Sequence, residues 1–193
     1  MSLVVNHAHL PAVLWFTGLS GAGKSTIASA VVHELLRRGV QTEFLDGDAV
    51  RLLSPTGFTR ADRDAHVKRV GFLASRLEHH GITVVCALIS PYEEARQYVR
   101  GLCARFIEIH VATPLAECER RDVKGLYQRA RRGEISNFTG ISDPYEVPRQ
   151  PELVIDTTCV AVEDAARLVL EAWAVAGTAP VAVPVTVPIG ARA

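Results

Sequence analysis

A glycine-rich segment near the N-terminus carries the residues best suited to chemistry. It matches the pattern G-x-x-x-x-G-K-[ST] and reads Gly18, Leu19, Ser20, Gly21, Ala22, Gly23, Lys24 and Ser25, with Thr26 next in the chain. Glycines let such a loop fold around phosphates with its N–H groups pointing inward. The lysine of this pattern reaches the β- and γ-phosphates, and the hydroxyl after it ligates Mg²⁺. The segment therefore predicts a phosphate-binding loop for a nucleoside triphosphate with Mg²⁺.

Two carboxylates follow a second apolar run. Asp46 and Asp48 stand where that run ends, and ligands bind at the carboxyl ends of strands in open α/β sheets. One carboxylate can accept the proton of an attacking hydroxyl while the other supports Mg²⁺ together with Ser25. Either aspartate could instead cap the next helix. We predict Lys24, Asp46 and Asp48 as catalytic, and Ser25 and Asp46 as metal ligands.

Short apolar runs alternate with helical patterns along the chain, which is typical of an α/β protein with a parallel sheet between helices. The expected strands are 13–17, 42–46, 83–88, 106–111 and 153–156. The first run precedes the glycine-rich loop and a helix follows it, as in P-loop NTPases. We expect apolar helix faces formed by Ala28, Val31, Val32 and Leu35, by Val70, Leu73, Ala74 and Leu77, and by Val162, Ala165, Ala166, Val169 and Trp173.

Two segments break the alternation. Residues 121–147 are polar and rich in Gly and Pro, and they are too long for a simple connection. The six bases between 120 and 132 fit a small anionic ligand or a solvated helix face equally well. We predict a mobile basic lid at 121–147 on a single domain, 1–175. In 176–193 a proline recurs every four residues, which predicts an extended or disordered tail.

Composition narrows the class of protein. The 193 residues carry a formal charge of zero, so no overall field draws the chain to nucleic acid or a membrane. The four cysteines lack metal-ligand spacing. No secretory signal and no apolar run of about 18–20 residues is present. We therefore expect a cytoplasmic protein that acts on small molecules.

An ordered set of further motifs resembles the adenylyl-sulfate kinases of sulfate activation. The set consists of Leu45-Asp46-Gly47-Asp48-x-Val50-Arg51, Gly57-Phe58-Thr59, Asp62-Arg63, Ile89-Ser90-Pro91-Tyr92, Arg121-Asp122-Val123-Lys124-Gly125-Leu126-Tyr127 and Phe138-Thr139-Gly140-Ile141-Ser142-Asp143-Pro144-Tyr145-Glu146. The resemblance covers about residues 11–169. Members of this family transfer the γ-phosphate of ATP to the 3′-hydroxyl of adenosine 5′-phosphosulfate (APS), giving 3′-phosphoadenosine 5′-phosphosulfate and ADP.

The resemblance implies roles for individual residues. It makes Asp48 the general base, gives the phosphosulfate to Arg51 and Arg63, and stacks the acceptor adenine between Phe58 and Phe138. It adds His66, Ile89, Ser90, Lys124 and Asn137 to the acceptor site, places Arg121, Thr157 and Cys159 at the ATP adenine, and implies ATP and Mg²⁺ as cofactors and a homodimer.

The resemblance also bears on covalent catalysis. Ser90 matches a serine described in the family as a phosphoserine intermediate, which makes Ser90 a catalytic candidate. In-line phosphoryl transfer needs only positioning and charge stabilisation, so we expect no covalent step.

Three departures from the family pattern fall on the acceptor side. Ala49 and His66 stand where asparagine is common, and the segment 52–56 is about two residues short. His66 could replace that asparagine as a hydrogen-bond donor. Two alternatives therefore stay open: a kinase of the same fold acting on another nucleotide-linked or small anionic acceptor, and a non-catalytic nucleotide-binding regulator. Retention of Lys24, Ser25 and both aspartates favours a catalyst.

Overall fold

The computed structural model describes residues 10–53 and 57–176. Its centre is a five-stranded sheet in the order β2-β3-β1-β4-β5, and all neighbouring strands are parallel. The strands are β1 (Val13–Thr17), β2 (Thr42–Asp46), β3 (Thr83–Ala87), β4 (Phe106–Val111) and β5 (Leu153–Ile155). The five predicted strands are therefore confirmed, with β3 and β5 each ending one residue before the predicted position.

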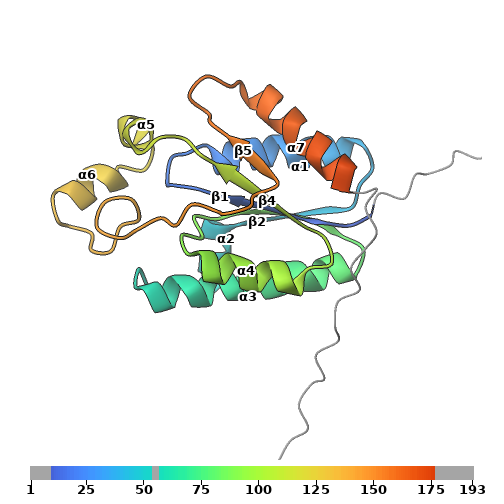
Figure 1. Cartoon of the computed structure of the whole chain (residues 1–193), viewed down its shortest axis with the longest axis horizontal. Coiled ribbons are helices and arrows are strands. Elements are labelled where there is room, and N and C mark those ends of the chain that lie inside the picture. The colour runs from blue at the N-terminus through green and yellow to red at the C-terminus, as the bar shows by residue number, and fades with distance from the viewer. Residues whose placement is uncertain (1–9, 54–56, 177–193) are drawn as a thin grey trace, which may run out of the picture.

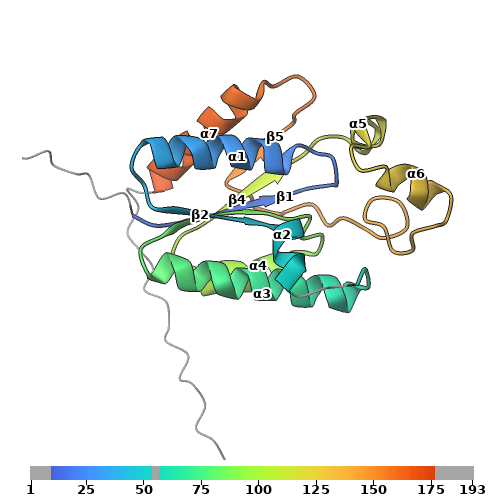
Figure 2. The same ribbon diagram turned by 180° about the vertical axis from the view of Figure 1, so that it is seen from behind.

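Helices cover both faces of the sheet (Figures 1 and 2). Helices α1 (Lys24–Arg37) and α7 (Val162–Ala176) lie on one face, and α3 (Arg60–His79) and α4 (Glu93–Leu102) lie on the other, where α2 (Gly47–Leu53) is also found. Helices α5 (Leu115–Arg121) and α6 (Leu126–Arg131) project beyond one end of the sheet. This three-layer arrangement confirms the predicted α/β fold class.

Strand β1 explains why the first apolar run shows no alternation. Its residues are all fully buried, as expected for a parallel strand covered on both faces. Leu14 and Phe16 point into the core under α1 and α7, whereas Val13 and Trp15 join the core under α3 and α4. The central strand thus fastens both helical layers and carries the glycine-rich loop at its carboxyl end.

The predicted apolar faces of α1 and α7 are buried except for Val32 and Val162, which are partly buried, whereas the predicted face of α3 includes one exposed residue. Leu73 is 39% exposed, whereas Val70 and Ala74 are buried. The buried arc of α3 extends instead to Gly71, which lies against Val99 of α4. A hydrophobicity pattern cannot identify such a contact, because the glycine side of the pair contributes no apolar side chain.

Helix α7 ends at Ala176, one residue past the predicted end of the domain. The predicted tail otherwise falls on 177–193, outside the described residues, as does part of the short segment 52–56. Among the helices of the described ranges, none is both long and apolar enough to cross a membrane.

The contact between α3 and α4 generates a prediction about stability. A Cβ atom on Gly71 would lie 2.3 Å from Val99 Cγ2, so Gly71→Ala forces the two helices apart. We expect it to lower the free energy of unfolding by about 1–3 kcal/mol in urea denaturation. Gly101→Ala in α4 is the control, since its Cβ would meet nothing within 4 Å.

Gly101→Ala should leave the free energy of unfolding unchanged or raise it by up to about 1 kcal/mol, because alanine is more favourable than glycine within a helix. Val99→Ala in the Gly71→Ala background should recover part of the loss. Equal stability of the two alanine variants would contradict the close packing of α3 and α4.

Candidate active site

The glycine-rich loop connects β1 to α1 and opens into a cavity. Gly18 has a φ of 145°, and a Cβ there would lie 2.5 Å from Val111 O, so no side chain fits. Gly23, at φ 99°, is the residue immediately before α1. The loop therefore presents its backbone and the amino end of α1 to one place, which is the arrangement that binds phosphates.

Lys24 is the first residue of α1 and is only 8% exposed. Its Nζ donates to Leu19 O at 2.6 Å. Burial lowers the pKa of Lys24 to about 8, although Cys118, Asp46 and Asp48 oppose the shift. A polyanion beside this desolvated ammonium would restore its affinity for the proton, so Lys24 is suited to bind phosphate.

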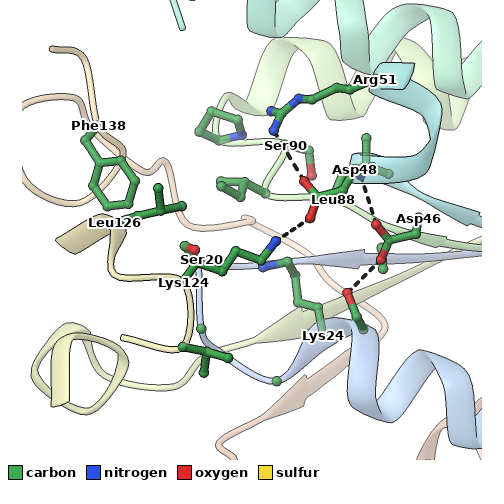
Figure 3. A pocket seen from close by; sticks show the side chains of 18 of the residues that line it. Ser20, Lys24, Asp46, Asp48, Arg51, Leu88, Ser90, Lys124, Leu126 and Phe138 are labelled. Carbon is green, nitrogen blue, oxygen red and sulfur yellow. Dashed lines mark hydrogen bonds and ion pairs between the residues drawn. The ribbon is translucent and has the colours of Figure 1, made fainter. Parts of the chain in front are cut away.

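Ser25 and Asp46 bring hydroxyl and carboxylate oxygens together. Ser25 Oγ donates to Asp46 Oδ2 at 2.8 Å, and Asp46 Oδ1 accepts from the backbone N–H of Asp48 at 2.9 Å (Figure 3). Asp46 thus caps α2 and also bonds to Ser25 at the end of the phosphate loop, so the cap is confirmed and the role as a metal ligand stays a prediction. Oxygen ligands of this kind fit Mg²⁺. Within the described ranges no group of three or more His, Cys, Asp or Glu could hold a metal alone.

Asp48, in α2, pairs with Lys124 of the segment between α5 and α6 (Figure 3). Arg51 Nη1 is 3.5 Å from Asp48 Oδ1. The hydrogen bond from Lys124 lowers the pKa of Asp48, and burial only partly opposes this effect. The carboxylate is therefore ionised near neutral pH and close to two cations predicted to bind the acceptor.

One cavity of about 330 Å³ gathers most of the predicted site residues. Those lining it are Ser20, Gly21, Gly23, Lys24, Ser25, Thr26, Asp46, Asp48, Arg51, Phe58, Arg63, His66, Ile89, Ser90, Arg121, Lys124 and Phe138. Gly18, Leu19, Ala22, Asn137, Thr157 and Cys159 lie outside this lining. The cavity thus joins the phosphate loop to the predicted acceptor residues.

Arg63 connects the two aromatic segments of the acceptor side. It is 4% exposed, its Nε donates to Phe58 O at 3.2 Å, and its Nη2 donates to Asn137 O at 2.8 Å. Phe58 is 44% exposed, whereas Phe138 is 3% exposed and packs edge-to-face on Tyr127. Phe138 is therefore both a core residue and part of the cavity wall.

His66 lines the cavity with its ring almost fully buried. A ring N–H of His66 bonds to the carbonyl of Gly47, and burial lowers the pKa of the imidazole to about 4. Its Nε2 is buried and has no partner. At neutral pH the ring is therefore uncharged, and its role as a hydrogen-bond donor to the acceptor stays a prediction.

Ser90 is buried and adopts a positive φ of 37°. Its Oγ accepts from Trp15 Nε1 at 3.1 Å, and its carbonyl accepts from Arg96 Nη1 at 2.7 Å. Helix α4 begins three residues later at Glu93, so Ser90 does not cap it. Ser90 forms part of the cavity wall, while a catalytic role for it stays a prediction.

Most of the basic segment faces solvent and not the cavity. The four arginines Arg120, Arg129, Arg131 and Arg132 pair with Glu117, Glu119 or Glu134. Of the six bases, only Arg121 and Lys124 line the cavity. The solvated-face interpretation is therefore right for four of them, and mobility of 121–147 stays a prediction.

On the ATP side, Arg121 Nη1 donates to Thr157 Oγ1 at 2.8 Å, and Thr157 Oγ1 donates to Ala22 O at 3.0 Å. Thr157 therefore supports the phosphate loop from behind, whereas Cys159 is exposed. Sequence reasoning missed Tyr127 as a site residue. Its hydroxyl donates to Ser20 O at 2.9 Å and its ring packs on Phe138. A short sequence pattern does not reveal such contacts, because the partners are distant in the chain.

Comparison with known proteins agrees with this geometry. Residues 10–156 match the family model described as adenylylsulphate kinase. The adenylyl-sulfate kinase of Geotalea daltonii is 52% identical over 168 residues, covering 85% of this chain and 83% of the relative. The structure of the Mycobacterium tuberculosis APS kinase in complex with AMPPNP and APS has a TM-score of 0.81 at 40% identity, covering 84% of this chain and 96% of that one.

A third match is the hexameric APS kinase of Thiobacillus denitrificans, with a TM-score of 0.67 and 37% identity, covering 88% of this chain and 30% of that one. The matched family model spans the phosphate loop, both aspartates and the cavity residues of α3 and α6. The chain belongs to the adenylylsulphate kinase family.

Proposed function

We infer that this chain is an ATP-dependent adenylyl-sulfate kinase, which phosphorylates the 3′-hydroxyl of APS. The observation that carries this inference is a single cavity in which the phosphate loop faces Arg51, Phe58, Arg63 and Phe138. Figure 3 shows Asp48 between Lys24 and Arg51. The solved relative from Mycobacterium tuberculosis was determined with AMPPNP and APS, which supports the same pair of ligands here.

Asp48 is the proposed general base for the acceptor hydroxyl. In this structure its carboxylate is held by Lys124, and both side chains are more than half exposed. Such a solvent-exposed pair contributes only about 0.2–1 kcal/mol, so an anionic acceptor can draw Lys124 away from Asp48. The carboxylate is then free to take the hydroxyl proton as the phosphoryl group arrives.

Lys24 and the loop N–H groups are proposed to hold the transferred phosphoryl group. Their positions are set by α1 and do not depend on the acceptor, so the charge that develops during transfer meets donors already in place. Mg²⁺ would be held by Ser25 and Asp46, where it would neutralise charge on the β- and γ-phosphates.

The acceptor would bind between the two aromatic segments joined by Arg63. Phe58 and Phe138 offer ring surface to the purine, and Arg51 and Arg63 offer forked donors to the phosphosulfate. Arg51 Nε is buried and has no hydrogen-bond partner among the described residues, so this donor is unsatisfied without a ligand. This combination favours an adenylated anion over a small sugar acid.

Ala49 and His66 support the second candidate, a kinase of the same fold with a different acceptor. His66 offers ring nitrogens where an asparagine would offer an amide oxygen and an NH2 group. Oligomeric state is a separate matter: the homodimer stays a prediction, and a solved relative from Thiobacillus denitrificans is described as hexameric.

A panel of acceptors tests the activity directly. Purified protein with MgATP should phosphorylate APS far faster than adenosine 5′-monophosphate, gluconate or shikimate, because only APS offers both the purine and the phosphosulfate. ADP release and the phosphorylated product are measured together. Turnover of another acceptor in preference to APS would replace this function with the second candidate.

Asp48→Asn tests the general base. The amide keeps the shape of the side chain but cannot take a proton, so kcat should fall by about 10²–10⁴-fold. ADP affinity, measured by calorimetry, should be unchanged because Asp48 does not hold the phosphates. A wild-type kcat in this variant would assign the base to another residue.

The lowered pKa of Lys24 predicts that nucleotide binding is accompanied by proton uptake. Its pKa of about 8 means that near pH 8 a large fraction is neutral, and phosphates should raise this pKa on binding. Binding should therefore take up a fraction of a proton at pH 8, and nucleotide affinity should fall as pH rises above 8. Calorimetry in buffers of different ionisation enthalpy measures the uptake, and Lys24→Met should abolish it. Uptake that persists in Lys24→Met would assign the proton to another group.

A further inference from the structure

A fully buried arginine lies behind the cavity wall formed by Ser90. Arg96, in α4, has no exposed surface and does not line the cavity. Its Nη1 donates to Ser90 O and its Nη2 donates to Glu146 O, each at 2.7 Å. One guanidinium thus joins the cavity wall to the end of the segment 121–147, here called the lid.

Two carboxylates compensate the buried charge. Arg96 Nε lies 2.8 Å from Glu108 Oε1, and Arg96 Nη2 lies 2.5 Å from Glu93 Oε2. Glu108 is equally buried and is shared with Arg100, whose Nη2 lies 3.0 Å from Glu108 Oε2. Such networks rarely stabilise a fold more than well-packed apolar side chains do. What they supply is fixed geometry, since the planar fork of an arginine donates in set directions.

On the cavity side, the geometry that Arg96 fixes is unusual. Ser90 has a positive φ, a conformation that a non-glycine residue keeps only when its surroundings hold it. The preceding carbonyl, Ile89 O, accepts from Thr17 Oγ1 at 2.8 Å, which attaches the same loop to β1. Arg96 and Thr17 therefore set the orientation of the wall that the acceptor would meet.

On the lid side, Arg96 is at the centre of a second set of contacts. Glu146 N donates to Pro91 O at 2.8 Å, and Glu146 Oε2 accepts from Glu93 N at 2.8 Å. Tyr145 OH lies 3.0 Å from Thr17 Oγ1. The end of the lid is thereby attached to the same loop that forms the cavity wall.

We propose that Arg96 is a positioning residue for the acceptor, which fixes the Ser90 wall and the end of the lid in one relation and so shapes the acceptor half of the cavity. It acts without touching the acceptor. This role rests on the adenylyl-sulfate kinase activity inferred above.

Arg96→Met and Arg100→Met test the proposal as a matched pair. Both remove an arginine of α4 from Glu108, but only Arg96 reaches Ser90 and Glu146. Arg96→Met should raise the KM for APS at least about tenfold, the effect of losing one charge-assisted hydrogen bond, and leave the KM for ATP unchanged. Arg100→Met should leave both values near those of the wild type.

Three further variants separate a positioning role of Arg96 from a role in folding. Glu108→Gln keeps both carbonyl contacts of Arg96 and should keep the wild-type KM for APS. Arg96→Met with Glu108→Gln removes the buried carboxylate that has lost one of its two arginine partners, so it should recover thermal stability while the KM stays high. Arg96→Lys keeps the charge but not the fork, and should fall between wild type and Arg96→Met.

Hydrogen exchange of the full chain without substrates gives a readout that does not depend on the acceptor. Amides of 143–147 should exchange faster in Arg96→Met than in wild type or Arg100→Met. Equal KM values and equal exchange in the two methionine variants would overturn the proposal. If the wild type does not act on APS, the proposed function fails and the exchange comparison alone decides the role of Arg96.

Discussion

The site depends on burying a parallel strand on both faces. Helical layers cover both faces of β1, so the loop that follows β1 emerges at the carboxyl edge of the sheet, between those two layers. The neighbouring strand β3 runs parallel to β1 and delivers Ser90 to the same edge, and β2, next to β3, delivers Asp46. Phosphate loop, carboxylates and acceptor wall therefore meet because three parallel strands end together.

Charge explains what that edge can bind. The chain has no net charge, yet the cavity collects Lys24, Arg51, Arg63, Arg121 and Lys124 against Asp46, Asp48 and Asp122. Burial lowers the pKa of Lys24 and also that of Arg63, so these cations are incompletely compensated by the protein. A ligand with several negative charges stabilises them, which favours two phosphate-bearing substrates over neutral ones.

The sequence predicted those features that depend on local order. Strand positions, the phosphate loop and the aspartates after β2 follow from short patterns, and the structure places them as expected. What it could not show were contacts between distant residues. Gly71 is buried against Val99, whereas Leu73, which was expected in the apolar face of α3, is exposed. This difference depends on how two helices pack. The pairing of four lid arginines with glutamates depends on side-chain reach, and charge counting alone left it open.

Two cations of different burial connect the lid to the rest of the molecule: Lys124 of the lid itself and Arg96 of α4. Lys124 is exposed, and its pair with Asp48 is the kind that water and ions weaken, so it can change partner at small cost. Arg96 is fully buried, and exchanging its partners would leave a charge without compensation in the core. The lid is therefore attached through a buried network at Glu146 and through an exposed ion pair at Lys124. If Asp48 is the general base proposed above, an acceptor that draws Lys124 away would release Asp48 while the attachment at Glu146 stays in place.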